Sequence, residues 1–288
     1  KPRTVKVLHR GNIQDPRDDV RPGTLPIFNG ENFEFKLAGD HPESERRAAL
    51  AQWITRKDNP LTWRSIVNRI WLWHFGQGIV ETPNDFGRMG QLPSHPKLLD
   101  WLATEFRNSS GSFKHLHKLI VTSATYRQSA TVSNEFTKID SNNRYHWRMN
   151  RRRLEAEALR DAILAVSGAL NNQIGGPGFY LFKLEKTAHS PHYEYHKFDP
   201  ADPKSHRRSV YRFIARSQPD PFMTTLDCAD SSQSTPKRDE TLTALQALSL
   251  LNNKFTLHMS NRFASRIEKE SKTLRGRIRR AHQLTTGR

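Results

Sequence analysis

The chain has a single cysteine, Cys228, and this scarcity excludes several kinds of site. One thiol cannot form an intrachain disulfide framework, a zinc site made of several thiolates, or the C-x-x-C-H attachment of haem. Long apolar runs are also missing, since no window approaches the roughly 18 to 20 apolar residues that a bilayer span requires. The sequence therefore predicts neither a membrane span nor a haem group within these 288 residues.

Acidic residues are scarce relative to basic ones. The chain has 29 Asp and Glu and 46 Lys and Arg, which gives a formal net charge of +17 and a pI near 10.3. A positive surface field favours polyanions such as nucleic acid, anionic lipid, or acidic and sulfated polysaccharide. No zinc-finger or RNA-recognition signature accompanies the charge, so nucleic acid is not the favoured partner.

Hydrophobic residues make up 35% of the chain, enough for a core, and most of them recur at helical spacing. The pattern predicts a mainly α fold, a helical bundle in which Thr62 caps one helix and residues 143–170 form the longest. Alternation in "TVKVLHR" (4–10) and "SVYRFIARS" (209–217) predicts two short strands. We expect these two strands to pair as a small antiparallel β element.

Composition divides the chain into four parts. Residues 1–40 are predicted to form a strand and a Pro-rich extended arm, and residues 41–178 a helical core. Residues 179–238 are rich in His and Pro and irregular, with one strand. Residues 239–288 form C-terminal helices that we expect to pack with 41–178 as a single domain. The start at Lys1, without a secretion signal, indicates a piece cut from a longer precursor or a processed product.

A resemblance to a known family rests on motifs that occur in a fixed order. They are "NPLTWRSIVNRIWLWHFGQGIVETPNDFGRMGQLPSHPKLLDWLATEF", "LIVTSATYRQSA", "NRRRLEAEALRDAILAVSG", "GGPGF", "RRSVYRFIARSQP" and "TLTALQALSLLNN". From about Arg3 to Arg266 the chain resembles the planctomycete-type C-terminal domain of unknown function, the PSD-type domain found in exported cytochrome-c-like proteins. The resemblance implies an exported, periplasmic or cell-surface setting, with haem only in a neighbouring region and the N-terminal domains of the same precursor as partners. It assigns no catalytic residues, which stay unknown.

The stretch "HSPHYEYH", residues 189–196, concentrates side chains that bind metals. Two imidazoles and a carboxylate are the ligand set of non-haem iron and of some zinc sites. The candidate ligands are His189, His192, Glu194 and His196, with Asp199 or Asp202 in support. The alternative is a polar surface loop whose tyrosines pack on the body.

Pro191 forbids a helix through all three histidines and leaves two geometries open. A helical turn that begins at Pro191 places His192 and His196 four residues apart on one face, a spacing used for metals. An extended segment instead places His192, Glu194 and His196 on one face, with the tyrosines on the other.

Arginine clusters are the main candidates for contact with a polyanion, because guanidinium forks bind carboxylate, sulfate and phosphate in pairs of hydrogen bonds. The candidates are Arg207, Arg208, Arg275, Arg277, Arg279 and Arg280, with Tyr193 and Tyr195 as accompanying aromatic rings. The C-terminal cluster has few acidic neighbours and is the best of them.

Two further features point to architecture rather than chemistry. Glu157 and Asp161 are like charges four residues apart, which Arg153 and Arg160 of the same helix can neutralise. A metal bridging both carboxylates is the alternative. Cys228 stands among aspartates, which raise the pKa of a thiol and disfavour a nucleophilic role.

Together these observations predict a non-catalytic binding or scaffold domain of an exported multidomain bacterial envelope protein, which contacts acidic or sulfated polysaccharide. The alternative is a metal-dependent hydrolase or oxidase that uses the loop 189–196, with zinc or iron as its cofactor. Outside that alternative, no cofactor is expected in this chain.

Overall fold

The structure is a computed structural model that describes residues 2–24, 34–186 and 190–287. In those residues the fold is mainly α, with eleven helices and two antiparallel sheets of two strands each, which confirms the predicted class. The chain divides into two compact units, unit 1 (1–151) and unit 2 (152–288). The four-part division expected from the sequence stays a prediction.

The N-terminal strand is confirmed, but its predicted partner is wrong. Strand β1 (Val5–Leu8) pairs antiparallel with β2 (Pro16–Val20), not with residues 209–217. The chain reverses between them through Arg10 (φ 51°) and Gly11 (φ 78°), both in left-handed conformations. The sequence of β2, "PRDDV", has no apolar alternation, so periodicity could not reveal it.

The segment 209–217 is not a strand. It begins with a 3-10 turn, η4 (Ser209–Tyr211), and meets extended backbone only at Phe179. The N–H of Phe179 donates to the carbonyl of Tyr211 at 3.1 Å, and the carbonyl of Phe179 accepts from the N–H of Phe213 at 2.9 Å. Contact with a single residue satisfies these groups but cannot extend into a ladder.

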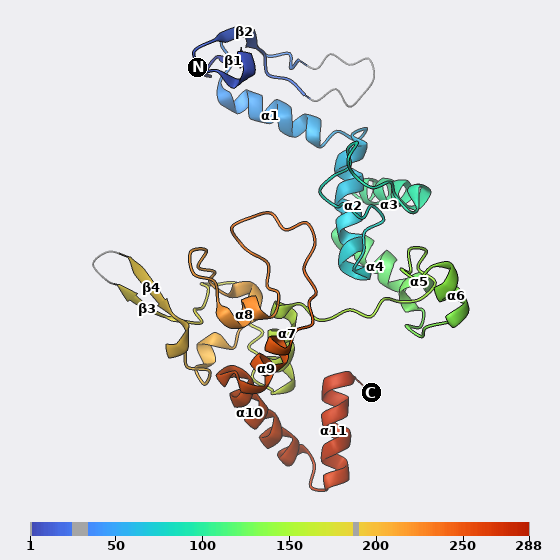
Figure 1. Cartoon of the computed structure of the whole chain (residues 1–288), viewed down its shortest axis with the longest axis vertical. Helices are drawn as coiled ribbons and strands as arrows, with labels where there is room; N and C mark the ends of the chain where they lie inside the picture. The colour runs from blue at the N-terminus through green and yellow to red at the C-terminus, as the bar shows by residue number, and fades with distance from the viewer. Residues whose placement is uncertain (1, 25–33, 187–189, 288) are drawn as a thin grey trace. The chain divides into compact units, whose positions relative to one another are not determined.

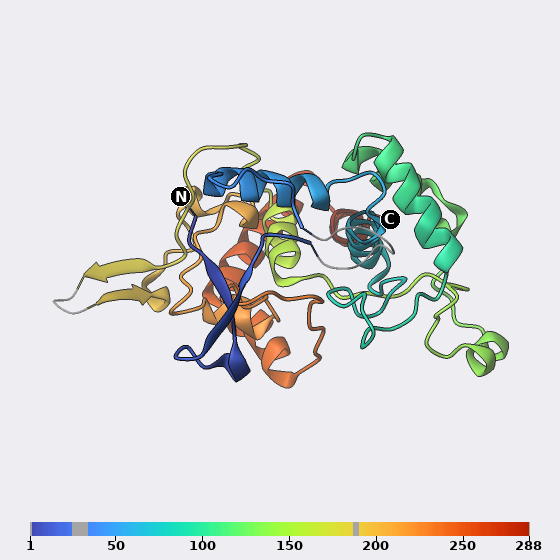
Figure 2. The ribbon, with the colours of Figure 1, turned by 90° about the horizontal axis from the view of Figure 1, so that it is seen from above.

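Two strands in unit 2 were not predicted. Strands β3 (Lys183–Lys186) and β4 (Pro191–Glu194) form an antiparallel hairpin that projects from the rest of unit 2 (Figures 1 and 2). The second of them contains the His-rich stretch, so the hairpin fixes the position of the residues predicted to bind metal.

Unit 1 is built mainly of helices around α2. Its helices are α1 (Glu43–Ile54), α2 (Pro60–Phe75), α3 (Pro96–Asn108), α4 (Phe113–Thr122), α5 (Ala124–Arg127) and α6 (Asn134–Ile139). Asn59, not Thr62, caps α2, because its Oδ1 accepts the N–H of Leu61 at 3.2 Å and proline fits the first helical turn. Gly76, with φ 79°, ends α2.

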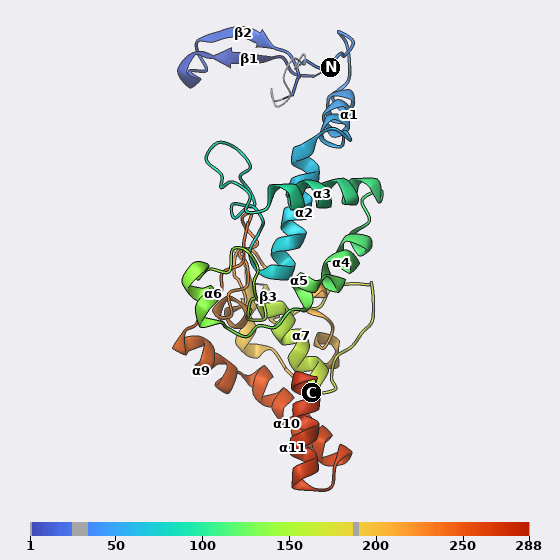
Figure 3. The same ribbon diagram turned by 90° about the vertical axis from the view of Figure 1, so that its right-hand side faces the viewer.

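The core of unit 1 lies where α3 crosses α2 (Figure 3). Val67, Ile70 and Phe75 of α2 are each at most 1% exposed and pack with Leu102 and Phe106 of α3. Each fully buried side chain of this size contributes about 1.5–3 kcal/mol to the free energy of unfolding. In the part of the chain that the structure describes, no helix has the length and apolar character needed to cross a bilayer.

Unit 2 surrounds a shorter central helix than the sequence predicted. Its helices are α7 (Ala156–Val166), α8 (Pro221–Thr225), α9 (Ala244–Asn252), α10 (Lys254–Glu270) and α11 (Leu274–Thr286). The predicted helix over 143–170 is wrong before Ala156, because Asn143 and His146 adopt positive φ angles of 53° and 54° that an α-helix excludes.

The core of unit 2 contains a buried charge. Leu164 of α7 packs against Phe255 and Met259 of α10, each at most 5% exposed. Arg160 of α7 is only 1% exposed beside them. A buried charge such as that of Arg160 must be matched by polar groups that reach it from elsewhere in the unit.

After a short connection, α11 turns back from the end of α10 (Figures 1 and 3).

Candidate functional site

The His-rich stretch follows the extended alternative from Pro191 to Glu194, and no helical turn begins at Pro191. Residues 191–194 are extended and pair with β3, where His192 lies opposite Glu185. The chain then enters a 3-10 turn, η2 (Tyr195–Lys197), so His196 lies outside the strand. His192 and Glu194 therefore share a strand face, as the extended alternative predicted, whereas His196 does not continue it.

The two tyrosines of this stretch pack on the body of unit 2. Their rings lie 4.9 Å and 5.4 Å from that of Phe182, centroid to centroid, for Tyr193 and Tyr195 respectively. The Tyr195 hydroxyl donates to the carbonyl of Gln218 at 2.8 Å. Burial, and then the nearby Asp220 carboxylate, raise the pKa of Tyr195 to about 12. This phenol is a structural donor at neutral pH.

The predicted metal ligands are only partly visible. His189 lies outside the described residues, and the Nδ1 of His196 lies 3.1 Å from the Oε2 of Glu194. Among the residues that the structure describes, no group of three or more His, Cys, Asp or Glu side chains could hold a metal ion. The metal hypothesis, which includes His189, stays a prediction.

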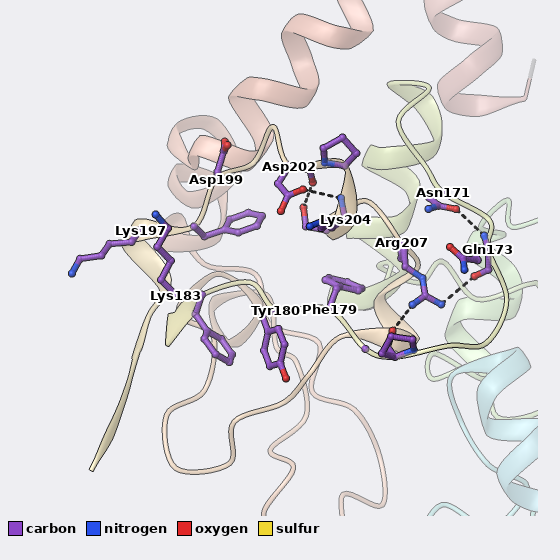
Figure 4. A pocket seen from close by; sticks show the side chains of 16 residues that line it. Asn171, Gln173, Phe179, Tyr180, Lys183, Lys197, Asp199, Asp202, Lys204 and Arg207 are labelled. Atoms are coloured by element: carbon purple, nitrogen blue, oxygen red, sulfur yellow. Dashed lines mark hydrogen bonds between the residues drawn. The ribbon is translucent and has the colours of Figure 1, made fainter. Parts of the chain in front are cut away.

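A groove of about 590 Å³ lies at the base of the hairpin (Figure 4). Its lining is Asn171, Gln173, Pro177, Gly178, Phe179, Tyr180, Phe182, Lys183, Lys197, Phe198, Asp199, Asp202, Pro203, Lys204, Ser205 and Arg207. Lys183 and Lys197 lie at one side of the view and Asn171 and Gln173 at the other. The groove thus combines aromatic rings, ammonium groups and side-chain amides along one depression, and we call it the basic groove.

Arg207, a predicted ligand contact, lines the basic groove but is engaged by the chain itself. It is 7% exposed, and its guanidinium donates to the carbonyls of Gln173, Gly175 and Pro177. The same group stacks on the Tyr211 ring at 4.1 Å. Arg207 therefore holds the Gly-rich turn in place and so shapes the groove.

Lysines, which the sequence analysis did not single out, carry the available charge of the basic groove. Lys183 and Lys204 are exposed and form no ion pair with any described residue. Lys197 bonds to Glu185, and this hydrogen bond raises the pKa of its ammonium group. Arg208 is also exposed, with its Nε 3.7 Å from Asp161.

Two carboxylates moderate this positive charge. The Oδ1 atoms of Asp199 and Asp202 accept the N–H of Ala201 at 2.9 Å and of Lys204 at 3.0 Å. These bonds stabilise the turns at the rim of the basic groove. One oxygen of each carboxylate is thereby used, and the other remains able to accept a hydrogen bond from a ligand hydroxyl.

The C-terminal arginines lie on α11, which contains no acidic residue. Two of them reach back to α10, with Arg277 Nη1 3.5 Å from Glu268 and Arg280 bonded to Glu270. Arg275 and Arg279 are exposed and have no ion-pair partner among the described residues. Half of the predicted cluster is therefore open to a ligand.

The carboxylates of α7 are neutralised by partners that the sequence only partly indicated. Glu157 pairs with Arg238 at 3.1 Å, whereas Arg153, the expected partner, bonds to Asp227. Asp161 lies 3.7 Å from Arg160, as expected. These ion pairs agree with the architectural interpretation of both acids.

Cys228 is held in the same network. Its thiol lies 3.4 Å from the Oε1 of Glu157, and Arg212 approaches the sulfur at 3.5 Å. Burial first, and then the charge of Glu157, raise the pKa of this thiol. The predicted direction is confirmed, although the responsible acid is Glu157 rather than the neighbouring aspartates.

Sequence reasoning missed the burial of Arg160 and did not single out Asp220. Arg160 donates to the carbonyls of Ser205 and Arg207 and to the Ser209 hydroxyl, and burial lowers its pKa to about 10. Asp220 caps α8, and burial raises the pKa of its carboxyl group. The dipeptide Asp-Pro at 220–221 was the available signal, since it is typical of a helix start.

Comparison with known proteins gives one match. A family model described as "PSD1: Protein of unknown function (DUF1553)" matches residues 46–288. The chain matches no curated protein and no solved structure. Because the matched segment covers most of the sequence, the chain belongs to the PSD1 family of proteins of unknown function.

Proposed function

We propose that this chain is a non-catalytic binding or scaffold domain that contacts acidic or sulfated polysaccharide through the basic groove of unit 2. The observation that carries the proposal is the lining of the groove, where exposed Lys183 and Lys204 occur together with Tyr180, a residue that is 56% exposed. Ammonium groups attract sulfate and carboxylate, and an aromatic ring offers a flat apolar surface to a sugar ring.

The distribution of charge supports a long polyanion over a small one. Unit 1 contains 23 Lys and Arg against 15 Asp and Glu, and unit 2 contains 23 against 14. The excess is therefore spread over both units instead of being focused on one pocket. Spread charge attracts a polymer at many weak contacts, whereas a small anion needs several donors at one point.

The carboxylates of the groove favour a polysaccharide over nucleic acid. The unbonded oxygens of Asp199 and Asp202 can accept hydrogen bonds from sugar hydroxyls. A DNA phosphodiester backbone has no free hydroxyls to donate to these oxygens, whereas a polysaccharide has hydroxyls along its whole length. The resemblance to exported proteins supports the same choice, because acidic polysaccharides are polyanions of the cell envelope. The N-terminal domains of the same precursor would then be the second partner.

Retention on a heparin column tests the proposal. Each exposed lysine contributes about 0.2–1 kcal/mol, so the double variant Lys183→Ala/Lys204→Ala should bind about 2- to 30-fold more weakly and elute at lower salt. The matched control is Lys114→Ala/Lys118→Ala, which removes the same charge from exposed positions on α4. The variant Arg275→Ala/Arg279→Ala measures the contribution of α11 to heparin binding.

Three outcomes would contradict the proposal. One is wild-type retention no stronger than that of a protein of ordinary charge. Another is an equal loss of heparin retention in the groove variant and in its control, which would show that retention depends on net charge alone. A third is competition by duplex DNA together with indifference to chondroitin sulfate and polygalacturonate, which would favour nucleic acid.

A further inference from the structure

A second cavity, of about 260 Å³, shares Phe198 with the lining of the basic groove. Phe222 and Phe255, with Leu181 and Pro221, form the rest of its apolar walls, and we call this cavity the aromatic chamber. A chamber of this size is below the usual range for drug-sized ligands. It suits a ligand of roughly one ring.

Asp220 supplies an unused acceptor to the aromatic chamber. Its side chain is 6% exposed, and its Oδ1 accepts the N–H groups of Phe222 at 3.0 Å and Met223 at 3.4 Å. Its Oδ2 lies 4.0 Å from the Nη1 of Arg212, which is too far for a hydrogen bond. This oxygen, in an ion pair but without a hydrogen bond, is able to accept one from a ligand or water.

Three other polar side chains of the chamber also keep unused capacity. Asn253 accepts the N–H of Phe255 at 2.9 Å through Oδ1, while its Nδ2 has no partner among the described residues. Tyr195 uses its hydroxyl proton on Gln218, which leaves the oxygen free to accept. His196 lies near Glu194 through Nδ1 and is 70% exposed, so its Nε2 is available from solvent. The chamber thus offers both donors and acceptors beside apolar walls.

We infer that the aromatic chamber binds a single pyranose ring, the terminal sugar unit of the polymer that lies in the basic groove. A pyranose has an apolar face of C–H groups and a rim of hydroxyls that both donate and accept. The three phenylalanine rings match the face, and Asp220, Asn253 and His196 match the rim. The choice of a sugar rests on the proposed function, and the shared Phe198 wall supports a continuous ligand.

Saturation-transfer NMR of the full chain with D-glucose, D-galactose, D-glucuronic acid and D-galacturonic acid tests the inference. At least one of the four sugars should bind with a Kd of about 1 mM, as expected for a ligand of this size. Asp220→Asn removes the free carboxyl oxygen but keeps a residue that caps helices well, and should weaken binding about tenfold. His196→Gln, at an exposed position, should weaken it about 2- to 10-fold.

His192→Gln is the matched control, since His192 is exposed on the same hairpin and does not line the chamber. Its affinity should equal that of the wild type. Absence of binding by all four sugars overturns the inference, as does equal binding by the wild type and both chamber variants. If the wild type is retained on heparin in either case, only the inference about the chamber fails. If the wild type is not retained, the proposed function of the basic groove fails as well.

Discussion

His146 offers a sharp test of how unit 1 tolerates a buried imidazole. The residue is 9% exposed and lies beside two stacked aromatic rings, 5.4 Å from Trp71 and 5.0 Å from Phe75, centroid to centroid. Its buried Nδ1 has no hydrogen-bond partner among the described residues. Burial, and then the charge of His95, lower its pKa from 6.5 to about 4, against a smaller opposing effect of Asp140.

The sign of the pH effect follows from this lowered pKa. The unfolded chain takes up a proton on His146 near pH 6.5, whereas the folded chain resists it until about pH 4. The stability contribution is therefore complete above pH 6.5 and is lost as the pH falls toward 4. A shift of this size corresponds to about 3 kcal/mol, and partial access of solvent reduces the expected loss to about 2–3 kcal/mol.

Tryptophan fluorescence during urea unfolding measures this loss in unit 1 alone, because all six tryptophans lie within residues 1–151. The variant His146→Phe keeps an aromatic ring and removes the titrating group. Its free energy of unfolding should fall by about 2–3 kcal/mol less than that of the wild type between pH 7 and pH 4. Comparison of the two proteins cancels the contribution of the carboxylates.

The same substitution at His115, an exposed residue of α4, is the control. It should leave the difference between pH 7 and pH 4 within about 0.5 kcal/mol of the wild type. If His146→Phe loses as much stability on acidification as the wild type, the buried neutral imidazole is not the cause of acid sensitivity in unit 1.

Two further predictions concern unit 2. Replacement of Arg160 by Met leaves the carbonyls of Ser205 and Arg207 and the Ser209 hydroxyl without their donor, and should lower the free energy of unfolding by about 3–5 kcal/mol. Circular dichroism should report this loss while the tryptophan signal of unit 1 stays constant; an unchanged dichroism transition would refute it. Elemental analysis should find less than one zinc or iron per chain, since Glu194 and His196 already pair. Stoichiometric metal that disappears in His192→Ala would instead favour the hydrolase or oxidase alternative.

Local signals predicted the helices well, because caps and apolar stripes act within a few residues. Gly76 ends α2 in a left-handed conformation that glycine favours, and Leu102 and Phe106, four residues apart on α3, are both buried. The strands were predicted less well, because a strand needs a partner that its own pattern does not specify. The strand pattern at 209–217 was satisfied by Phe179 alone, and β2 formed from a polar sequence because a turn placed it beside β1.

The candidate site was predicted less completely than the fold. The arginine clusters drew attention to Arg207, yet its guanidinium is occupied by carbonyls about 30 residues earlier in the chain. No sequence pattern distinguishes such an arginine from one that faces solvent. Lys183 and Lys204 were overlooked for the opposite reason, because isolated lysines are common and only the fold gathers them into one groove.

The presence of Phe198 in the lining of two cavities has a thermodynamic consequence. A ligand that rotates this ring while it occupies the groove also alters the shape of the chamber. If a ligand in one cavity changes the affinity of the other cavity by some factor, a ligand in the second cavity changes the affinity of the first by the same factor. Cooperativity between the two cavities, of either sign, can therefore be transmitted through Phe198, which lines both.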